Sequence, residues 1–219
     1  MSLCLKKRKA LKFDLGMLDK LLADLQNRGI KTVYPFFDGE IFVNPESYEI
    51  LRRIRKELPE VFILFHTNGV LLDNKEKRSA VIETADQVIF SIDGATSGTY
   101  LKYRKGGDFE KAFRNMSDLI SERDRSGKKY PLVDWKYLVF RWNSSRRELK
   151  HARKLAQEAG VDRLIFMPTI RPFWGISLYH LLIKGIAQEK IGRLYADRKE
   201  LNLREKRVDN KLVKGFLNK

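Results

Sequence analysis

Apolar residues recur along the chain at two spacings that alternate with one another. Between positions 15 and 25 the leucines recur at helical spacing, which predicts a first helix with Asp14 as its N-cap and Gly29 at its end. In contrast, the apolar run at 61–65, VFILF, is continuous and short. Continuous runs of this kind are typical of strands covered on both faces.

The alternation continues to about residue 168. We predict strands at 32–36, 61–66, 87–92, 134–140 and 163–167. Helices are predicted between them. One starts at Asn44-Pro45, a weaker one covers 74–84, and a third starts at Asp108. The last starts at a capping box of Ser145 and Glu148 and ends at Gly160.

Successive strands separated by helices of this length require parallel crossovers, so the fold class is α/β. Because the order begins with a helix, we predict a partial parallel (β/α) barrel that lacks its first strand. The pattern decays after Pro168. We therefore divide the chain into a core, 1–170, and a basic helical C-terminal extension, 171–219.

Composition narrows the class of protein. The 219 residues are 43% hydrophobic and 33% charged, which fits a soluble globular protein. No run of 18 apolar residues predicts a membrane span, and the N-terminal MSLCLKKRK lacks the apolar segment of a secretory signal. A single cysteine excludes an internal disulfide, and we expect a cytoplasmic protein.

The formal net charge of +16 would attract anionic partners, such as nucleic acid, anionic lipid or phosphorylated substrates. The segment 146–154, RRELKHARK, carries five basic residues, yet it has a complete apolar stripe, which equally predicts a solvated helix face. The aromatic and apolar segment 173–187 fits either an interfacial membrane helix or a helix that closes the barrel. A non-catalytic basic module that binds nucleic acid or another anion is therefore one alternative.

Polar residues follow every predicted strand. In parallel α/β folds, ligands bind beyond the carboxyl ends of the strands, so we expect these residues to share one rim. In chain order they are Asp38-Gly39-Glu40, His66-Thr67-Asn68-Gly69, Ser91-Ile92-Asp93-Gly94, Arg141-Trp142-Asn143 and Met167-Pro168-Thr169. Each could also be an ordinary turn.

Five segments together resemble a known enzyme family. They are GEIFVNPE, HTNGVLL, DQVIFSIDGA, YRKGGDFEKAFRN and YLVFRWN. Their order resembles the core of radical S-adenosylmethionine (radical SAM) enzymes over residues 4–168, and in particular the branch with peptide-maturing and MoaA-like proteins. The resemblance implies an iron–sulfur enzyme that generates a 5′-deoxyadenosyl radical and abstracts hydrogen from a substrate, here unknown.

The resemblance also implies roles for single residues. Gly39 and Glu40 match the family's Gly-Glu motif, which holds the methionyl ammonium, although Ile41 replaces the usual Pro. Ser91 matches a cofactor contact, and Arg104 matches an arginine that grips the carboxylate. From residue chemistry alone, Glu40 could instead cap a turn, and Arg104 could form a surface salt bridge. The ribose and adenine would be lined by Asn68, Asn143 and Met167.

The family's [4Fe–4S] cluster is held by three cysteines in a C-x3-C-x2-C motif. Cys4 matches the third cysteine, and Met1 stands where the second would be. We therefore expect a chain that begins inside the motif and does not assemble the cluster alone. The expected partners are a reductant for the cluster and an unknown substrate, which could be anionic or a peptide.

Overall fold

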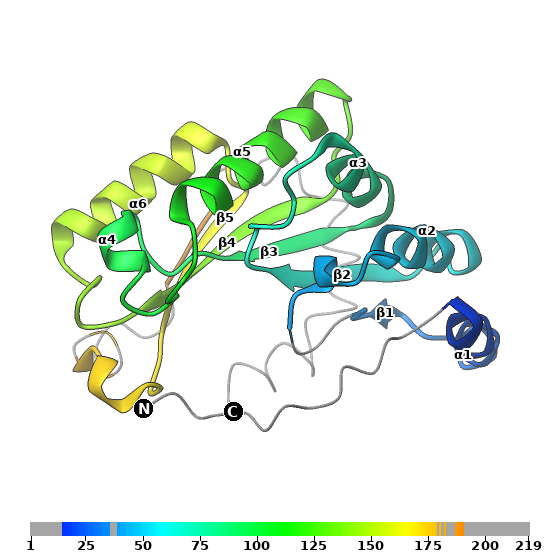
Figure 1. Ribbon diagram of the computed structural model, residues 1–219, viewed down its shortest axis with the longest axis horizontal. Coiled ribbons are helices and arrows are strands. Elements are labelled where there is room, and N and C mark those ends of the chain that lie inside the picture. Colours follow the sequence, from blue (N-terminus) through cyan, green and yellow to red (C-terminus); the bar gives the residue numbers. More distant parts are fainter. Residues whose placement is uncertain (1–14, 36–38, 179, 181, 183–186, 191–219) are drawn as a thin grey trace.

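The computed structural model describes residues 15–35, 39–178, 180, 182 and 187–190 (Figure 1). Asp14, Asp38, Cys4 and the segment 191–219 lie outside the described residues. The helices are α1 Leu15–Asn27, α2 Ser47–Glu57, α3 Lys75–Thr84, α4 Ser97–Tyr100, α5 Phe109–Arg125 and α6 Arg146–Ala159, with short 3-10 turns η1 Ile41–Val43 and η2 Phe173–Gly175. The strands are β1 Thr32–Val33, β2 Phe62–Thr67, β3 Gln87–Ser91, β4 Leu132–Val139, β5 Arg163–Pro168 and β6 Ala187–Lys190.

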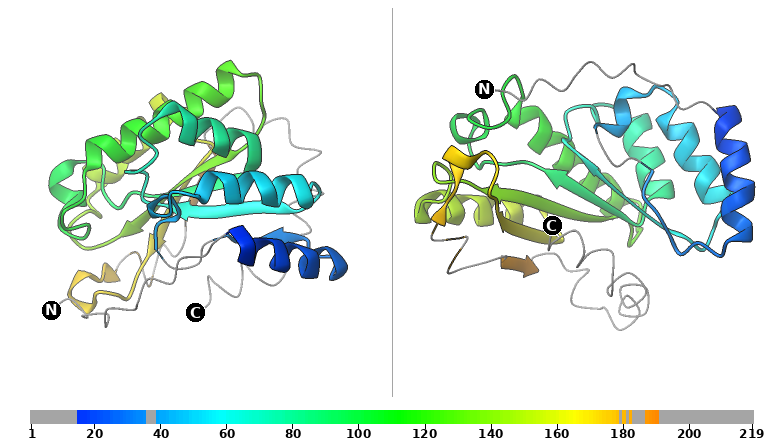
Figure 2. Two further views of the ribbon diagram at one scale, coloured as in Figure 1. Left: turned by 45° about the vertical axis from the view of Figure 1, so that its right-hand side comes forward. Right: turned by 90° about the horizontal axis from the view of Figure 1, so that it is seen from below.

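The strands form one sheet in sequence order, from β1 to β6. Each of the first five strands pairs in parallel with the next, and helices α2, α3, α5 and α6 lie together on one face of the sheet (Figures 1 and 2). The α/β class and the partial parallel barrel predicted from the sequence are confirmed.

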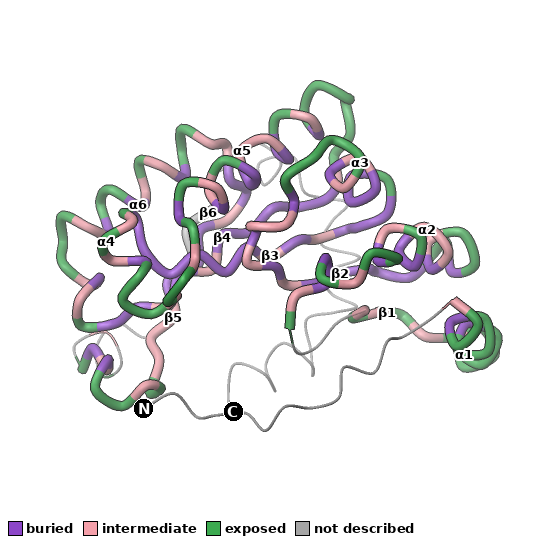
Figure 3. The backbone as a smooth tube through the Cα atoms, in the orientation of Figure 1, coloured by how far each residue is buried: buried purple, intermediate pink, exposed green. Residues whose placement is uncertain are grey.

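The hydrophobic core lies between the sheet and this helical layer (Figure 3). Alternate strand residues enter it, because successive side chains of a strand point to opposite faces. On β2 these are Ile63 and Phe65, and on β4 they are Val133, Trp135 and Tyr137, all fully buried. The residues that alternate with them, including His66 and Lys136, therefore face the opposite, inner side of the partial barrel.

Two predicted helix starts are confirmed by their caps. Asp108 accepts a hydrogen bond from the Lys111 amide at 2.9 Å, and Ser145 accepts one from the Glu148 amide at 3.2 Å.

The predicted start of α2 is wrong. The helix begins at Ser47 and not at Pro45, because the Asn44 side chain accepts a hydrogen bond from the Glu46 amide at 3.0 Å and holds these residues in a turn.

The antiparallel strand β6, which pairs with β5, was not expected from the sequence. Its four residues, AQEK, show neither an apolar run nor strict alternation, so only its partner identifies it. β1 is shorter than the predicted 32–36. Within the described part of the chain, no helix has the length and apolar character needed to cross a bilayer.

A buried aspartate supports the sheet at two equivalent places. Asp86 precedes β3 and accepts hydrogen bonds from the Ile63 amide of β2 and from Arg55 of α2. Asp162 precedes β5 and accepts them from the Val133 amide of β4 and from Arg123 of α5. In both cases an arginine from the helix that precedes the neighbouring strand, β2 or β4, neutralises a carboxylate at the amino ends of the strands.

Candidate functional site

Glu40 lies beyond β1 at the carboxyl end of the sheet. The chain reaches it through Gly39, whose φ of 108° is accessible only to glycine at low cost. One carboxylate oxygen of Glu40 accepts a hydrogen bond from the Thr67 hydroxyl at 2.8 Å. The other accepts one from the Asn68 amide at 2.7 Å. Two strand ends, those of β1 and β2, therefore meet at this carboxylate.

The Glu40 carboxylate is half-buried and has no cationic partner among the described residues. Burial raises its pKa above the ordinary value, against the hydrogen bonds from Asn68, Thr67 and Phe42 and the more distant charge of Arg104, all of which lower it. Burial destabilises the charged form of this carboxylate, so a cation bound beside it would stabilise that form strongly.

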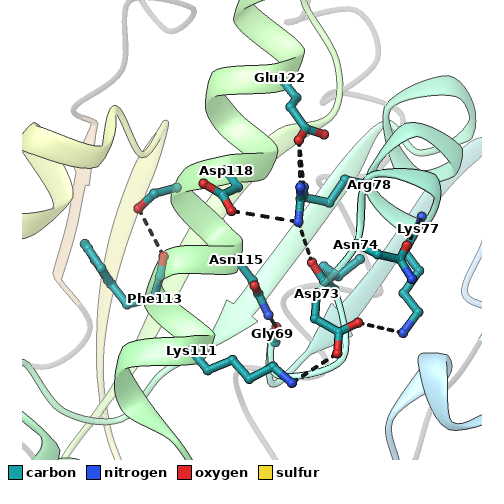
Figure 4. A network of polar contacts seen from close by, with 12 residues as sticks. Gly69, Asp73, Asn74, Lys77, Arg78, Lys111, Phe113, Asn115, Asp118 and Glu122 are labelled. Carbon is teal, nitrogen blue, oxygen red and sulfur yellow. Dashed lines mark hydrogen bonds and ion pairs between the residues drawn. The ribbon is translucent and has the colours of Figure 1, made fainter.

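The turn after β2 is held from the helical layer. The Asn115 side chain of α5 donates hydrogen bonds to the carbonyl oxygens of Gly69 at 2.8 Å and Val70 at 3.2 Å (Figure 4). The Asn68 side chain accepts one from the Val70 amide at 2.9 Å. This places the Asn68 amide against Glu40, whereas the Asn68 side chain is used within its own turn.

A second carboxylate, Asp93, follows β3 and is fully buried. It accepts hydrogen bonds from Arg104 Nε at 2.7 Å and from the Leu138 amide of β4 at 2.9 Å. Burial lowers the pKa of Arg104, but the charge and the hydrogen bond of Asp93 raise it overall. Arg104 is thus held in a partly buried ion pair that engages Nε and leaves its two terminal nitrogens to other partners.

The remaining predicted site residues lie in different settings. Ser91 ends β3 and is 7% exposed, and Met167 is half-buried on β5 beside Leu138 of β4. Asn143 is fully buried: its amide nitrogen donates to the carbonyl oxygens of Asp93 and Leu138, and its oxygen accepts from the Phe140 amide. Its side chain closes the loop after β4. Cys4 lies outside the described residues.

Sequence reasoning placed His66 of β2 at the expected rim but missed its neighbour on the inner face, Lys136 of β4. The Lys136 ammonium nitrogen lies 3.2 Å from His66 Nδ1, and the ring of Tyr34 stacks on that of His66 with centroids 5.8 Å apart. Burial, and then the charge of Lys136, lower the pKa of His66 to about 3. The two residues are 70 positions apart in the chain, and only the sheet brings them together.

This pKa predicts a pH-dependent stability. Between about pH 6.5 and pH 3 the unfolded chain binds a proton at His66 that the folded protein does not bind. The free energy of unfolding should therefore fall as the pH falls, by about 1.6 kcal/mol for this group between pH 6.5 and pH 5. We expect His66→Gln to remove this component in urea titrations at the two pH values. The exposed His151→Gln variant should keep it; equal pH dependence of wild type and His66→Gln would contradict the assignment.

The basic segment on α6 forms a solvated face. Leu149, Ala152 and Ala156 are its buried residues, whereas Lys150 and Lys154 are exposed. No feature of this helix distinguishes a binding surface from an ordinary charged face. Across the described ranges, no group of three or more His, Cys, Asp or Glu residues could hold a metal ion.

The chain is similar to one known family and to several solved structures. The model of the radical SAM superfamily matches residues 6–130. No curated protein matches the chain. Among solved structures, SuiB from Streptococcus suis bound to S-adenosylmethionine is 14% identical, with 67% of this chain and 31% of that chain covered and a TM-score of 0.53. SuiB bound to its precursor peptide SuiA is 12% identical, with 72% and 33% covered and a TM-score of 0.56.

An archaeal TYW1 structure is 15% identical, with 74% of this chain and 60% of that chain covered and a TM-score of 0.49. The chain thus spans 60% of the TYW1 chain and about a third of the SuiB chains. At these identities the two SuiB structures establish similarity of fold.

Proposed function

The chain belongs to the radical SAM superfamily of enzymes, and we propose that the rim at the carboxyl ends of β1 to β5 binds S-adenosylmethionine. The observation that carries this proposal is Glu40, a half-buried carboxylate that neutral donors hold in place and that no described cation neutralises. The methionyl ammonium is a cation of suitable size and chemistry for this position.

Arg104 supports the other end of the same amino-acid group. Asp93 fixes the guanidinium through Nε, so we propose that the terminal nitrogens bind the methionyl carboxylate as a planar fork. Asp93 then acts as a positioning residue, because it contacts Arg104 and not the cofactor. Glu40 would thus meet the positive ammonium of the methionyl group, and Arg104 would meet its negative carboxylate.

The other proposed contacts are Gly39, Ser91 and Met167, which lie at strand ends of the same rim. The backbone amide of Asn68 donates to Glu40. Both the nitrogen and the oxygen of the Asn143 side-chain amide are hydrogen-bonded to backbone groups. We therefore assign these two asparagines to shaping the rim, and Asn143 is not proposed as a direct ligand.

The residues of this chain fit the cofactor but do not fit the cluster. With a [4Fe–4S] cluster, S-adenosylmethionine supplies a 5′-deoxyadenosyl radical that abstracts hydrogen from a substrate. Cluster ligation depends on cysteine thiolates, and the sequence holds one cysteine, Cys4, which cannot replace the family's three. We also propose that the substrate is an anion or a peptide and that a reductant supplies electrons to the cluster. The boundary between core and C-terminal extension at residue 170 is likewise a proposal.

Thermal unfolding with and without ligand tests the proposal. At ten times its Kd, S-adenosylmethionine should stabilise the folded chain by about 1.4 kcal/mol, a rise in Tm of roughly 3–6 °C for a domain of this size. Methylthioadenosine, which lacks the ammonium and the carboxylate, should raise Tm less at the same concentration. Equal shifts with both ligands would contradict binding through the methionyl group, and stabilisation by duplex DNA alone would favour the basic binding module instead.

A further inference from the structure

The inner face of the sheet carries a cation that the cofactor site does not use. Lys136 is in register with Ser91 of β3, and cross-strand neighbours share a face, so its ammonium lies beside the proposed cofactor rim and inside the partial barrel. The core residues Trp135 and Tyr137 flank it in sequence and point the opposite way, toward the helices.

Lys136 has no carboxylate partner among the described residues. Asp93 gives its two oxygens to Arg104 and to the Leu138 amide. Asp134, two positions earlier on β4, is bonded to Gln87 and paired with Arg163. Both acids that face Lys136 along the inner side are thus neutralised by arginines.

A polar atom in direct contact with Lys136 on this face is His66 Nδ1, at 3.2 Å. An ammonium can only donate, so this contact requires the neutral His66 ring with its proton on Nε2, and the low pKa of His66 keeps the ring neutral. A neutral imidazole orients a half-buried ammonium but does not neutralise it, and cations withdrawn from water are normally paired. Burial lowers the pKa of Lys136; the charge of Asp93 raises it and the charge of Arg104 lowers it further. A half-buried ammonium with no ion pair to a described carboxylate therefore suits an anionic ligand.

We propose that Lys136, oriented by His66, binds a carboxylate group of the substrate inside the partial barrel. One ammonium beside a neutral ring matches a single negative charge, whereas phosphate sites usually combine an arginine fork or several backbone amides. The inference rests on the proposed function only in assigning this carboxylate to a substrate, since Arg104 is already proposed to bind the carboxylate of S-adenosylmethionine.

The test follows the NMR cross-peak of the His66 ring in carbon–proton spectra. The peak is identified because it is absent from the spectrum of His66→Gln. Acetate titrated against chloride at constant ionic strength should shift this peak with a saturable dependence. Lys136→Met should weaken the response at least tenfold, and Lys136→Arg should keep it within a few-fold. Inorganic phosphate should bind more weakly than acetate. Far-UV circular dichroism of each variant checks that the fold is kept.

Repeating the titration with saturating S-adenosylmethionine identifies the source of the carboxylate. Persistence of the acetate response supports a substrate site. Its abolition would overturn the inference, because Lys136 would then hold the cofactor's own carboxylate. The absence of any acetate response in wild type, or an unchanged response in Lys136→Met, would also overturn it. Because the first titration contains no S-adenosylmethionine, its failure leaves the cofactor proposal standing, and failure of cofactor binding leaves this test valid.

Discussion

Arg123→Ala is expected to lower the free energy of unfolding by about 3–5 kcal/mol, because it strands a buried carboxylate. Arg123 and Asp162 are 2% and 1% exposed, and they form an ion pair between α5 and the start of β5. Arg123 also donates to the Pro131 carbonyl at 2.9 Å. Without the guanidinium, Asp162 would keep the Val133 amide as its described donor and would have to ionise without a counter-charge.

The exposed pair Arg52–Glu83 provides the matched control. Its side chains are 39% and 43% exposed, so Arg52→Ala should cost at most about 1 kcal/mol. Urea unfolding followed by tryptophan fluorescence measures both variants at pH 7. An equal loss of stability in the two variants would show that the buried pair contributes no more than a surface pair does.

Much of the fold could be predicted because it depends on local patterns. A continuous apolar run located β2, and the caps at Asp108 and Ser145 located two helix starts, since a cap needs only residues three positions apart. β6 could not be predicted, because a short polar strand is defined by its pairing with β5 and not by its own residues.

The candidate site divides in the same way. Glu40 and Arg104 were found through motifs, and Thr67, Asn68 and Asp93 stood among the polar residues expected at the rim. The contacts that join them to Glu40 and Arg104 were not predicted, because residue spacing does not show which side chains meet. Asn143 shows the opposite error: an asparagine at a strand end suits a ligand contact, yet the structure buries its amide among backbone groups. Long-range partners decide whether a polar residue is available for a ligand.

Glu40→Gln is expected to weaken S-adenosylmethionine binding by about ten- to a hundred-fold, which corresponds to roughly 1.5–3 kcal/mol for a charge-assisted contact. The fold should be kept. The glutamine oxygen can accept from the Asn68 amide, and its nitrogen can donate to the Thr67 hydroxyl, so both present contacts have a neutral replacement. What the substitution removes is the negative charge.

The measurement that tests the cofactor site most directly is isothermal titration of S-adenosylmethionine into wild type, Glu40→Gln and the control Glu46→Gln, whose carboxylate is exposed near the start of α2. We predict saturable binding to wild type, unchanged affinity for Glu46→Gln, and a loss of at least tenfold for Glu40→Gln at unchanged Tm. No saturable binding to wild type, or equal affinities for all three proteins, would contradict the proposed cofactor site.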